Sequence, residues 1–159
     1  MSSTPDMPTI KETIAEIGRE VSRLDGYDPP ELTGDRSRLQ PFLDQLNGGL
    51  PHDFIEYLDH CIPAEPYGLR VEFHDLESLI IEHEEAEPGA DAIQQGFFCI
   101  AKEGDGTQFA YDISTRKVLQ IECAYETADD TRKESWNEWN SLLEFLTWVL
   151  DDLRAEDAH

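Results

Sequence analysis

The sequence predicts an α+β fold in which an antiparallel β-meander packs against N-terminal and C-terminal helices. Apolar residues recur at the spacing of a helix near both ends of the chain, and they alternate with a period of two in the middle. Helical and strand segments are grouped, which argues against a sheet built from βαβ units. The 159 residues suit a single domain, which we expect at 9–154, with flexible ends at 1–8 and 155–159.

The first predicted helix begins at Ile10. Its apolar residues lie four, three, four and three positions apart, which places them on one helix face: Ile10, Ile14, Ile17, Val21 and Leu24. Thr9 and Glu12 have the spacing of a capping box, and Asp25-Gly26 is typical of a helix end. The next segment, 27–35, is expected to be a loop, because its two prolines cannot continue a helix.

Two shorter helices are expected before residue 62. The first has Pro41 in its first turn and ends at Asn47-Gly48-Gly49; its apolar residues are Leu39, Phe42, Leu43 and Leu46. The second has Pro51 at the first helical position, where the missing N–H costs nothing. Its apolar face consists of Phe54, Tyr57, Leu58 and Cys61.

From residue 69 the pattern becomes that of strands. Alternation over 69–73 predicts a half-buried strand, and the apolar run Phe97–Ala101 predicts a buried one. Between them, 75–84 is expected to be a helix, followed by an acidic loop at 84–91; the inward residues of the helix are Leu76, Leu79 and Ile80. After a turn at Gly104-Asp105-Gly106, strands over 109–113 and 118–123 complete an antiparallel meander.

A polar segment, 126–138, precedes the last predicted helix. Ser141 and Glu144 form a second capping box. The helix has a wide apolar stripe of Leu142, Phe145, Leu146, Val149, Leu150 and Leu153. Burial of side chains this large makes the helix part of the core.

Three stretches together resemble the SUKH superfamily, which includes fungal cell-wall-assembly regulators and many bacterial immunity proteins. They are Leu50–Leu58 with its Leu-Pro opening, Gly104–Ile113 followed by Val118, and Trp139 followed by Ser141–Leu146. The resemblance covers about residues 40–153, but Cys61-Ile62-Pro63 stands where the family usually has an Asn-Gly turn. It implies a compact, non-catalytic α+β binding scaffold. For bacterial members it implies an immunity protein that neutralises a toxin, often a nuclease.

The chain carries a net charge of −23, of which −20 falls on residues 41–159. Such a field repels nucleic acid and anionic membranes, because both are bound through Lys and Arg. It attracts basic proteins and speeds encounter with them. Only four of the twelve bases are Lys, and acid-rich, Lys-poor surfaces also suit a saline cytoplasm. Both explanations of the charge stay open.

The N-terminal sequence lacks the basic and apolar regions of a signal peptide, and no apolar run approaches the roughly 20 residues that span a bilayer. We therefore expect a cytoplasmic protein that does not bind membranes. Cys61, Cys99 and Cys123 form no C-x-x-C pair, so neither disulfides nor a thiolate zinc site are indicated. Cys99 and Cys123 lie in apolar runs and are expected to be buried.

No motif in the sequence indicates a metal, a cofactor or catalysis. The five histidines, at positions 52, 60, 74, 83 and 159, form no His-Glu-x-x-His motif. No Gly-x-Ser-x-Gly elbow is present. We therefore expect no enzyme. A small hydrolase is the remaining alternative, and it would need a pocket with converging carboxylates.

The candidate partner-binding residues are acidic or aromatic: Glu82, Glu84, Glu85, Glu87, Asp91, Asp129, Asp130, Trp136 and Trp139. The run 82–87 ends a predicted helix, where acids oppose the macrodipole, although a solvated helix end would explain it as well. Trp136 and Trp139 lie in a polar segment and are candidates for exposed interface anchors. Trp148, by contrast, is expected to extend the core.

The leading hypothesis is a non-catalytic acidic domain, an immunity-type inhibitor that binds a basic, nuclease-like bacterial toxin. An acidic inhibitor can occupy a phosphate-binding surface as a phosphate mimic. The alternative is a regulatory protein-interaction module of the same fold whose acidity reflects a saline cytoplasm.

Overall fold

The computed structural model describes residues 8–46 and 49–156. The predicted flexible ends and the turn at 47–49 therefore fall mostly outside the described residues. The elements, in chain order, are α1 (Ile10–Asp25), β1 (Leu32–Thr33), α2 (Arg36–Leu43), α3 (His52–His60), β2 (Ile62–Pro63), β3 (Tyr67–Gly68), β4 (Val71–Phe73), α4 (Leu76–Glu84), α5 (Gly89–Ala92), the 3-10 helix η1 (Ile93–Gln95), β5 (Phe97–Glu103), β6 (Gln108–Asp112), β7 (Val118–Ile121), α6 (Ala128–Lys133), β8 (Asn137–Trp139) and α7 (Leu142–Ala155).

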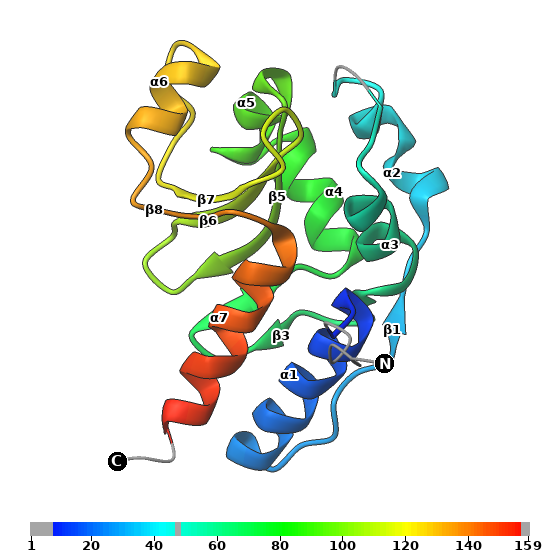
Figure 1. Ribbon diagram of the computed structural model, residues 1–159. Helices are drawn as coiled ribbons and strands as arrows, with labels where there is room; N and C mark the ends of the chain where they lie inside the picture. The colour runs from blue at the N-terminus through cyan, green and yellow to red at the C-terminus, as the bar shows by residue number, and fades with distance from the viewer. Residues whose placement is uncertain (1–7, 47–48, 157–159) are drawn as a thin grey trace, which may run out of the picture.

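The central element is a six-stranded antiparallel sheet with the order β3-β4-β5-β6-β7-β8 (Figure 1). This confirms the predicted α+β class with an antiparallel meander. The strand predicted at 69–73 is shorter, because β4 begins at Val71 and Leu69 lies in the β3–β4 hairpin with 43% of its surface exposed. A separate two-stranded pair joins β1 to β2.

One face of the sheet packs against most of the helices, and we call it the front face. Helices α1 and α7 run side by side (Figure 1) and, with α2, α3 and α4, form a single apolar core with this face. The ring of Phe54 in α3 stacks on Tyr111 in β6 at 4.6 Å between centroids. The hydroxyl of Tyr111 donates to Asp53 at 2.9 Å, so the same contact satisfies its polar end.

The opposite, back face of the sheet is also apolar and has a smaller cluster of its own. Its buried members are Ala92, Phe97, Cys99, Ala110, Leu119 and Ile121. Ala124 and Ala128 pack on it from the segment that follows β7. Because β5, β6 and β7 are apolar on both sides, the sheet needs cover on both faces, and α5 and the start of α6 supply it at the back.

The structure confirms the two N-terminal caps that the sequence predicts, at the start of α1 and at the start of α7. The Thr9 hydroxyl accepts a hydrogen bond from Glu12 N at 3.0 Å, and Ser141 does the same for Glu144 N. Helix α2 is different: it begins at Arg36, capped by Asp35, so the expectation that Pro41 lies in the first turn is wrong. Cys123 is exposed, because it lies beyond the end of β7.

None of the helices in the described part of the chain is long and apolar enough to span a membrane. The longest, α1, has 16 residues.

His83 is a buried histidine whose two ring nitrogens both take part in hydrogen bonds. Nδ1 donates to the carbonyl of Leu79 at 2.8 Å, and Nε2 accepts from Cys99 N at 2.9 Å. The ring stacks on Phe98 at 4.2 Å. Burial lowers the pKa of His83 to about 4. The neutral ring thus joins α4 to β5.

We expect His83 to make stability depend on pH in the acid range. In the unfolded chain its pKa is about 6.5, so the unfolded state binds the proton first as pH falls. The contribution is complete above about pH 6.5 and is lost on the way to about pH 4, a loss of about 3 kcal/mol. The measurement is the free energy of unfolding of the wild type and of His83→Gln between pH 7 and pH 4.

The difference between the two proteins isolates His83 from the carboxylates and from His74, whose pKa burial also lowers. The wild type should lose stability over this range relative to His83→Gln. Parallel curves for the two proteins would contradict the assignment.

Candidate protein-binding surface

The acidic run after α4 divides into a buried carboxylate and exposed ones. Glu84, Glu85, Glu87 and Asp91 are exposed. Glu82 is only 8% exposed, and its carboxylate accepts a hydrogen bond from Gly89 N at 2.8 Å. The inclusion of Glu82 among surface contacts is therefore corrected: its side chain satisfies the backbone at the start of α5.

The second acidic group lies on α6, a helix that the sequence pattern did not predict. Asp129 and Asp130 occupy its first turn and are exposed, and Glu126 just before it is exposed as well. Thr127 caps the helix by accepting from Asp130 N at 3.1 Å. Acids in a first turn favour the helix dipole, so these two residues also have a local structural role.

The structure brings the two acidic groups to one end of the molecule. The Thr131 hydroxyl in α6 donates to Gln95 Oε1 at 2.7 Å, and Gln95 donates through its amide nitrogen to the carbonyl of Tyr125. Asp91 and Glu126 consequently line the same surface hollow. Segments about 35 residues apart in the sequence form one surface.

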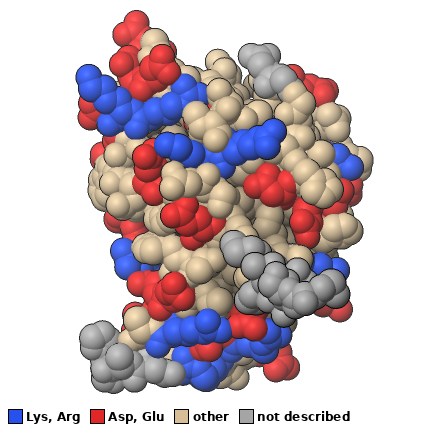
Figure 2. All heavy atoms as spheres, in the orientation of Figure 1, with Lys and Arg blue, Asp and Glu red and all other residues tan. Residues whose placement is uncertain are grey.

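We call this surface the acidic end. We count in it the exposed carboxylates of the two segments, of which Asp91 and Glu126 line the shared hollow: Glu84, Glu85, Glu87, Asp91, Glu126, Asp129 and Asp130. Within its two segments, 84–91 and 124–133, the only bases are Arg132 and Lys133. Figure 2 shows acidic side chains gathered at the end of the molecule that carries α6, with basic side chains next to them.

Carboxylates within the acidic end are close enough to affect each other. The pKa of Glu87 is raised, first by loss of solvation and then by a hydrogen bond and repulsion from Asp91. Glu84 is the last residue of α4 and Glu85 is its C-cap, where a negative charge opposes the macrodipole and costs up to about 1 kcal/mol. The fold gains nothing from this placement, so it favours a binding role.

An ion pair between Arg132 and Asp112 holds α6 against the sheet. The Arg132 Nε atom donates to Asp112 at 2.7 Å, and the Asp112 side chain is completely buried. Asp112 also accepts from Ser114 N at 3.1 Å and from the Thr115 hydroxyl at 2.8 Å. The guanidinium lies 5.4 Å from the ring centroid of Phe97. This pair fixes the position of the α6 carboxylates.

The two candidate tryptophans have different environments. Trp136 is 52% exposed, and its backbone N–H donates to the carbonyl of Gln120 at 2.8 Å. It lines a separate hollow beside Leu69, which shares no lining residue with the hollow at the acidic end. Trp139 is only 8% exposed and packs against Phe145 at 5.0 Å. The expectation that Trp139 is an exposed anchor is wrong, because β8 turns it into the core.

Sequence reasoning missed a further surface, along β8 and the outer side of α7. Its hollow is lined by carboxylates around partly exposed apolar residues: Glu138, Leu143, Glu144, Trp148 and Asp151 are among its lining residues. Leu143 and Trp148 stand outside the apolar stripe of α7, and this departure from helical spacing is the signal that could have found them.

We expect removal of the Arg132 charge to destabilise the protein strongly. Arg132→Met leaves the buried Asp112 carboxylate without its cation, which should lower the free energy of unfolding by about 3 kcal/mol. Lys133→Met, a neighbouring exposed change, should alter it by less than about 0.5 kcal/mol. Denaturant unfolding measures both. Equal, small effects would show that the pair does not hold α6.

Both buried histidines are hydrogen-bonded, His74 to Gln108 and His83 as described above. Within 8–46 and 49–156, no three His, Cys, Asp or Glu side chains are grouped so that they could hold a metal ion. Comparison with known proteins gives no match to a family model, a curated protein or a solved structure.

Proposed function

We propose that this chain is a non-catalytic binding domain that engages a basic protein through the acidic end. The observation that carries the proposal is the convergence of two acidic segments, 84–91 and 124–133, on one surface. A surface with seven carboxylates and two bases in its segments attracts a cationic patch and repels nucleic acid.

The exposed position of the carboxylates in the acidic end favours rapid association with a partner. Exposed carboxylates at an interface rim mainly raise the association rate, because they steer the partner during encounter. The ion pair of Arg132 with Asp112 holds α6 in place before binding, so the α6 carboxylates need little ordering when a complex forms. Exposed Glu84 and Glu85 lie at the end of the packed helix α4.

The narrower proposal is an immunity-type inhibitor of a basic, nuclease-like toxin. The resemblance to the SUKH superfamily motivates it, and so does the chemistry, because a nuclease must present Lys and Arg to hold phosphate. Capture of the products of neighbouring genes should recover a basic effector, and co-expression should rescue cells from it. Failure of both would count against an inhibitor role and leave the regulatory module as the alternative.

We expect neutralisation of the acidic end to slow association with the captured basic effector. Glu84→Gln, Glu85→Gln and Asp130→Asn, combined in one variant, remove three exposed charges without touching Arg132 or Glu82. At low salt the association rate constant should fall at least about tenfold. Stopped-flow or surface-binding kinetics measure it.

The matched control removes three exposed carboxylates elsewhere, with Asp28→Asn, Glu31→Gln and Glu65→Gln. It should change the rate constant by less than about threefold. An equal loss in both variants would mean that net charge alone matters, and would contradict a specific acidic end.

The dependence of stability on salt concentration distinguishes the two explanations of the negative charge, partner binding and adaptation to a saline cytoplasm. If the charge serves a partner, the isolated protein should be folded in dilute buffer, and its Tm should change little up to 2 M NaCl while the complex weakens as salt rises. Differential scanning calorimetry measures this. A Tm that climbs steadily through molar salt would instead favour the saline explanation of the charge.

A further inference from the structure

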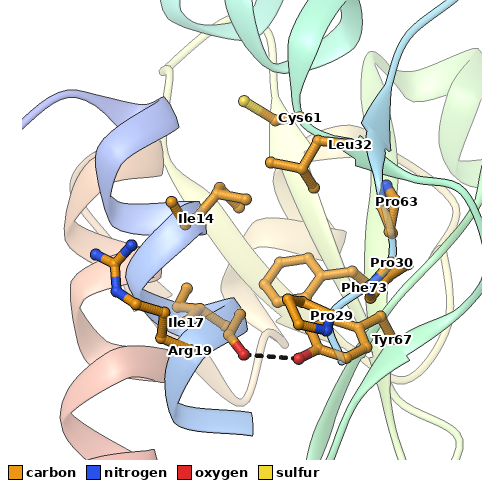
Figure 3. A pocket seen from close by; sticks show the side chains of 12 residues that line it. Ile14, Ile17, Arg19, Pro29, Pro30, Leu32, Cys61, Pro63, Tyr67 and Phe73 are labelled. Carbon is orange, nitrogen blue, oxygen red and sulfur yellow. Dashed lines mark hydrogen bonds between the residues drawn. The ribbon is translucent and has the colours of Figure 1, made fainter. Parts of the chain in front are cut away.

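An apolar pocket of about 250 Å³ lies on a different part of the molecule, between α1 and the segment that leads into β1 (Figure 3). Ile14, Ile17 and Gly18 of α1 form one wall. Pro29, Pro30, Leu32, Cys61, Pro63, Tyr67 and Phe73 form most of the rest. The pocket shares no residue with the acidic end, so what it binds is independent of the proposed function.

Short strands and prolines hold the walls of the pocket in place. Leu32 in β1 pairs with Pro63 in β2, and the amide of Ala64 donates to the carbonyl of Glu31 at 2.8 Å. Gly34 follows β1, and a Cβ atom added there would lie 2.2 Å from the carbonyl oxygen of Asp59. The segment therefore approaches α3 too closely for a side chain at this position.

Two polar side chains that line the pocket already have interaction partners within the protein. The Tyr67 hydroxyl donates to the carbonyl of Gly18 at 2.8 Å, shown as the dashed line in Figure 3. Burial raises the pKa of Tyr67, and a hydrogen bond from the Ser22 side chain to its oxygen acts in the opposite direction. Arg19 is paired with Glu16 at 2.9 Å, and its guanidinium points away from the cavity (Figure 3).

Cys61 contributes an uncharged wall. Burial raises the pKa of its thiol to about 12, so the sulfur is not a thiolate nucleophile at neutral pH. The pocket therefore offers binding without a covalent step.

The volume of the pocket and the net charge of the protein limit the class of ligand that the pocket can bind. An engineered apolar cavity of about 150 Å³ holds benzene, whereas drug-sized ligands need roughly 300–1,000 Å³. An anion would be repelled by the net charge of −23. A cation would lose its hydration among apolar walls that carry no counter-charge. The rings of Phe73 and Tyr67 favour a flat, aromatic partner.

We propose that this pocket binds a small neutral aromatic molecule of one or two rings, which packs against Phe73 and the ring of Tyr67. Leu32, with 37% of its surface exposed, lies in the wall formed by β1. A larger side chain at this position should occupy the space that the ligand needs.

Indole is the test probe, titrated into the full chain and followed by ¹H–¹⁵N NMR and by Tm. We expect saturable shifts that centre on Ile14, Gly18 and Phe73, and a Tm that rises with indole concentration, because binding stabilises the folded state. Leu32→Trp should weaken binding at least about tenfold by filling the pocket. If Leu32→Trp fails to fold, Ala15→Phe makes the same test from α1.

The matched control is Leu69→Trp, which adds the same ring at an exposed leucine that does not line the pocket. It should bind indole as the wild type does. The proposal is overturned by shifts that never saturate, by shifts that centre elsewhere, or by equal affinity of the Leu32→Trp and Leu69→Trp variants.

Discussion

The need to bury the back face of the sheet governs where the acidic end forms. Strands β5, β6 and β7 carry apolar side chains toward both faces, and the back face holds Phe97, Ala110 and Leu119 among others. An exposed face of this kind would forfeit roughly 1.5–3 kcal/mol for each large side chain. The chain covers it with Ala92 of α5 and Ala128 of α6. Acidic segments flank both alanines, so covering the back face carries both segments to one end.

Much of the fold follows from local patterns in the sequence. Helices α1, α4 and α7 have an apolar stripe and a capping side chain a few residues away, and these signals act within one helix. The β5–β6 turn is likewise local, because Asp105 accepts a hydrogen bond from Thr107 N at 2.9 Å and Gly106 adopts a positive φ of 94°. These elements can be predicted from the sequence, because the interactions that stabilise them connect residues that are close together along the chain.

The remaining elements depend on contacts between distant residues. Strand β8 is polar and only three residues long, and it is decided by pairing with β7 and by the hydrogen bond from Asn137 to Gln120. The same holds for individual side chains of the candidate site. Trp139 is buried by aromatic neighbours from other elements, and Glu82 by a backbone N–H seven residues away. Periodicity along one segment cannot reveal either.

The carboxylates of this acidic chain differ in what they contribute to the fold. Asp112 and Glu82 are buried and stabilise the fold through specific hydrogen bonds, and Asp75 caps α4. Glu84 and Glu85 oppose the dipole of the helix that carries them. Buried carboxylates such as Asp112 therefore serve the fold, whereas only exposed carboxylates can contact a partner. Among the exposed ones, Glu84 and Glu85 support a partner-binding role more strongly than Asp129 and Asp130, which also stabilise α6.

Hydrogen–deuterium exchange of the chain with and without its captured basic partner tests the central claim most directly. The account predicts that both segments of the acidic end, 84–91 and 124–133, become protected together in the complex. Protection confined to Trp136 or to the outer side of α7, with both acidic segments unchanged, would contradict it.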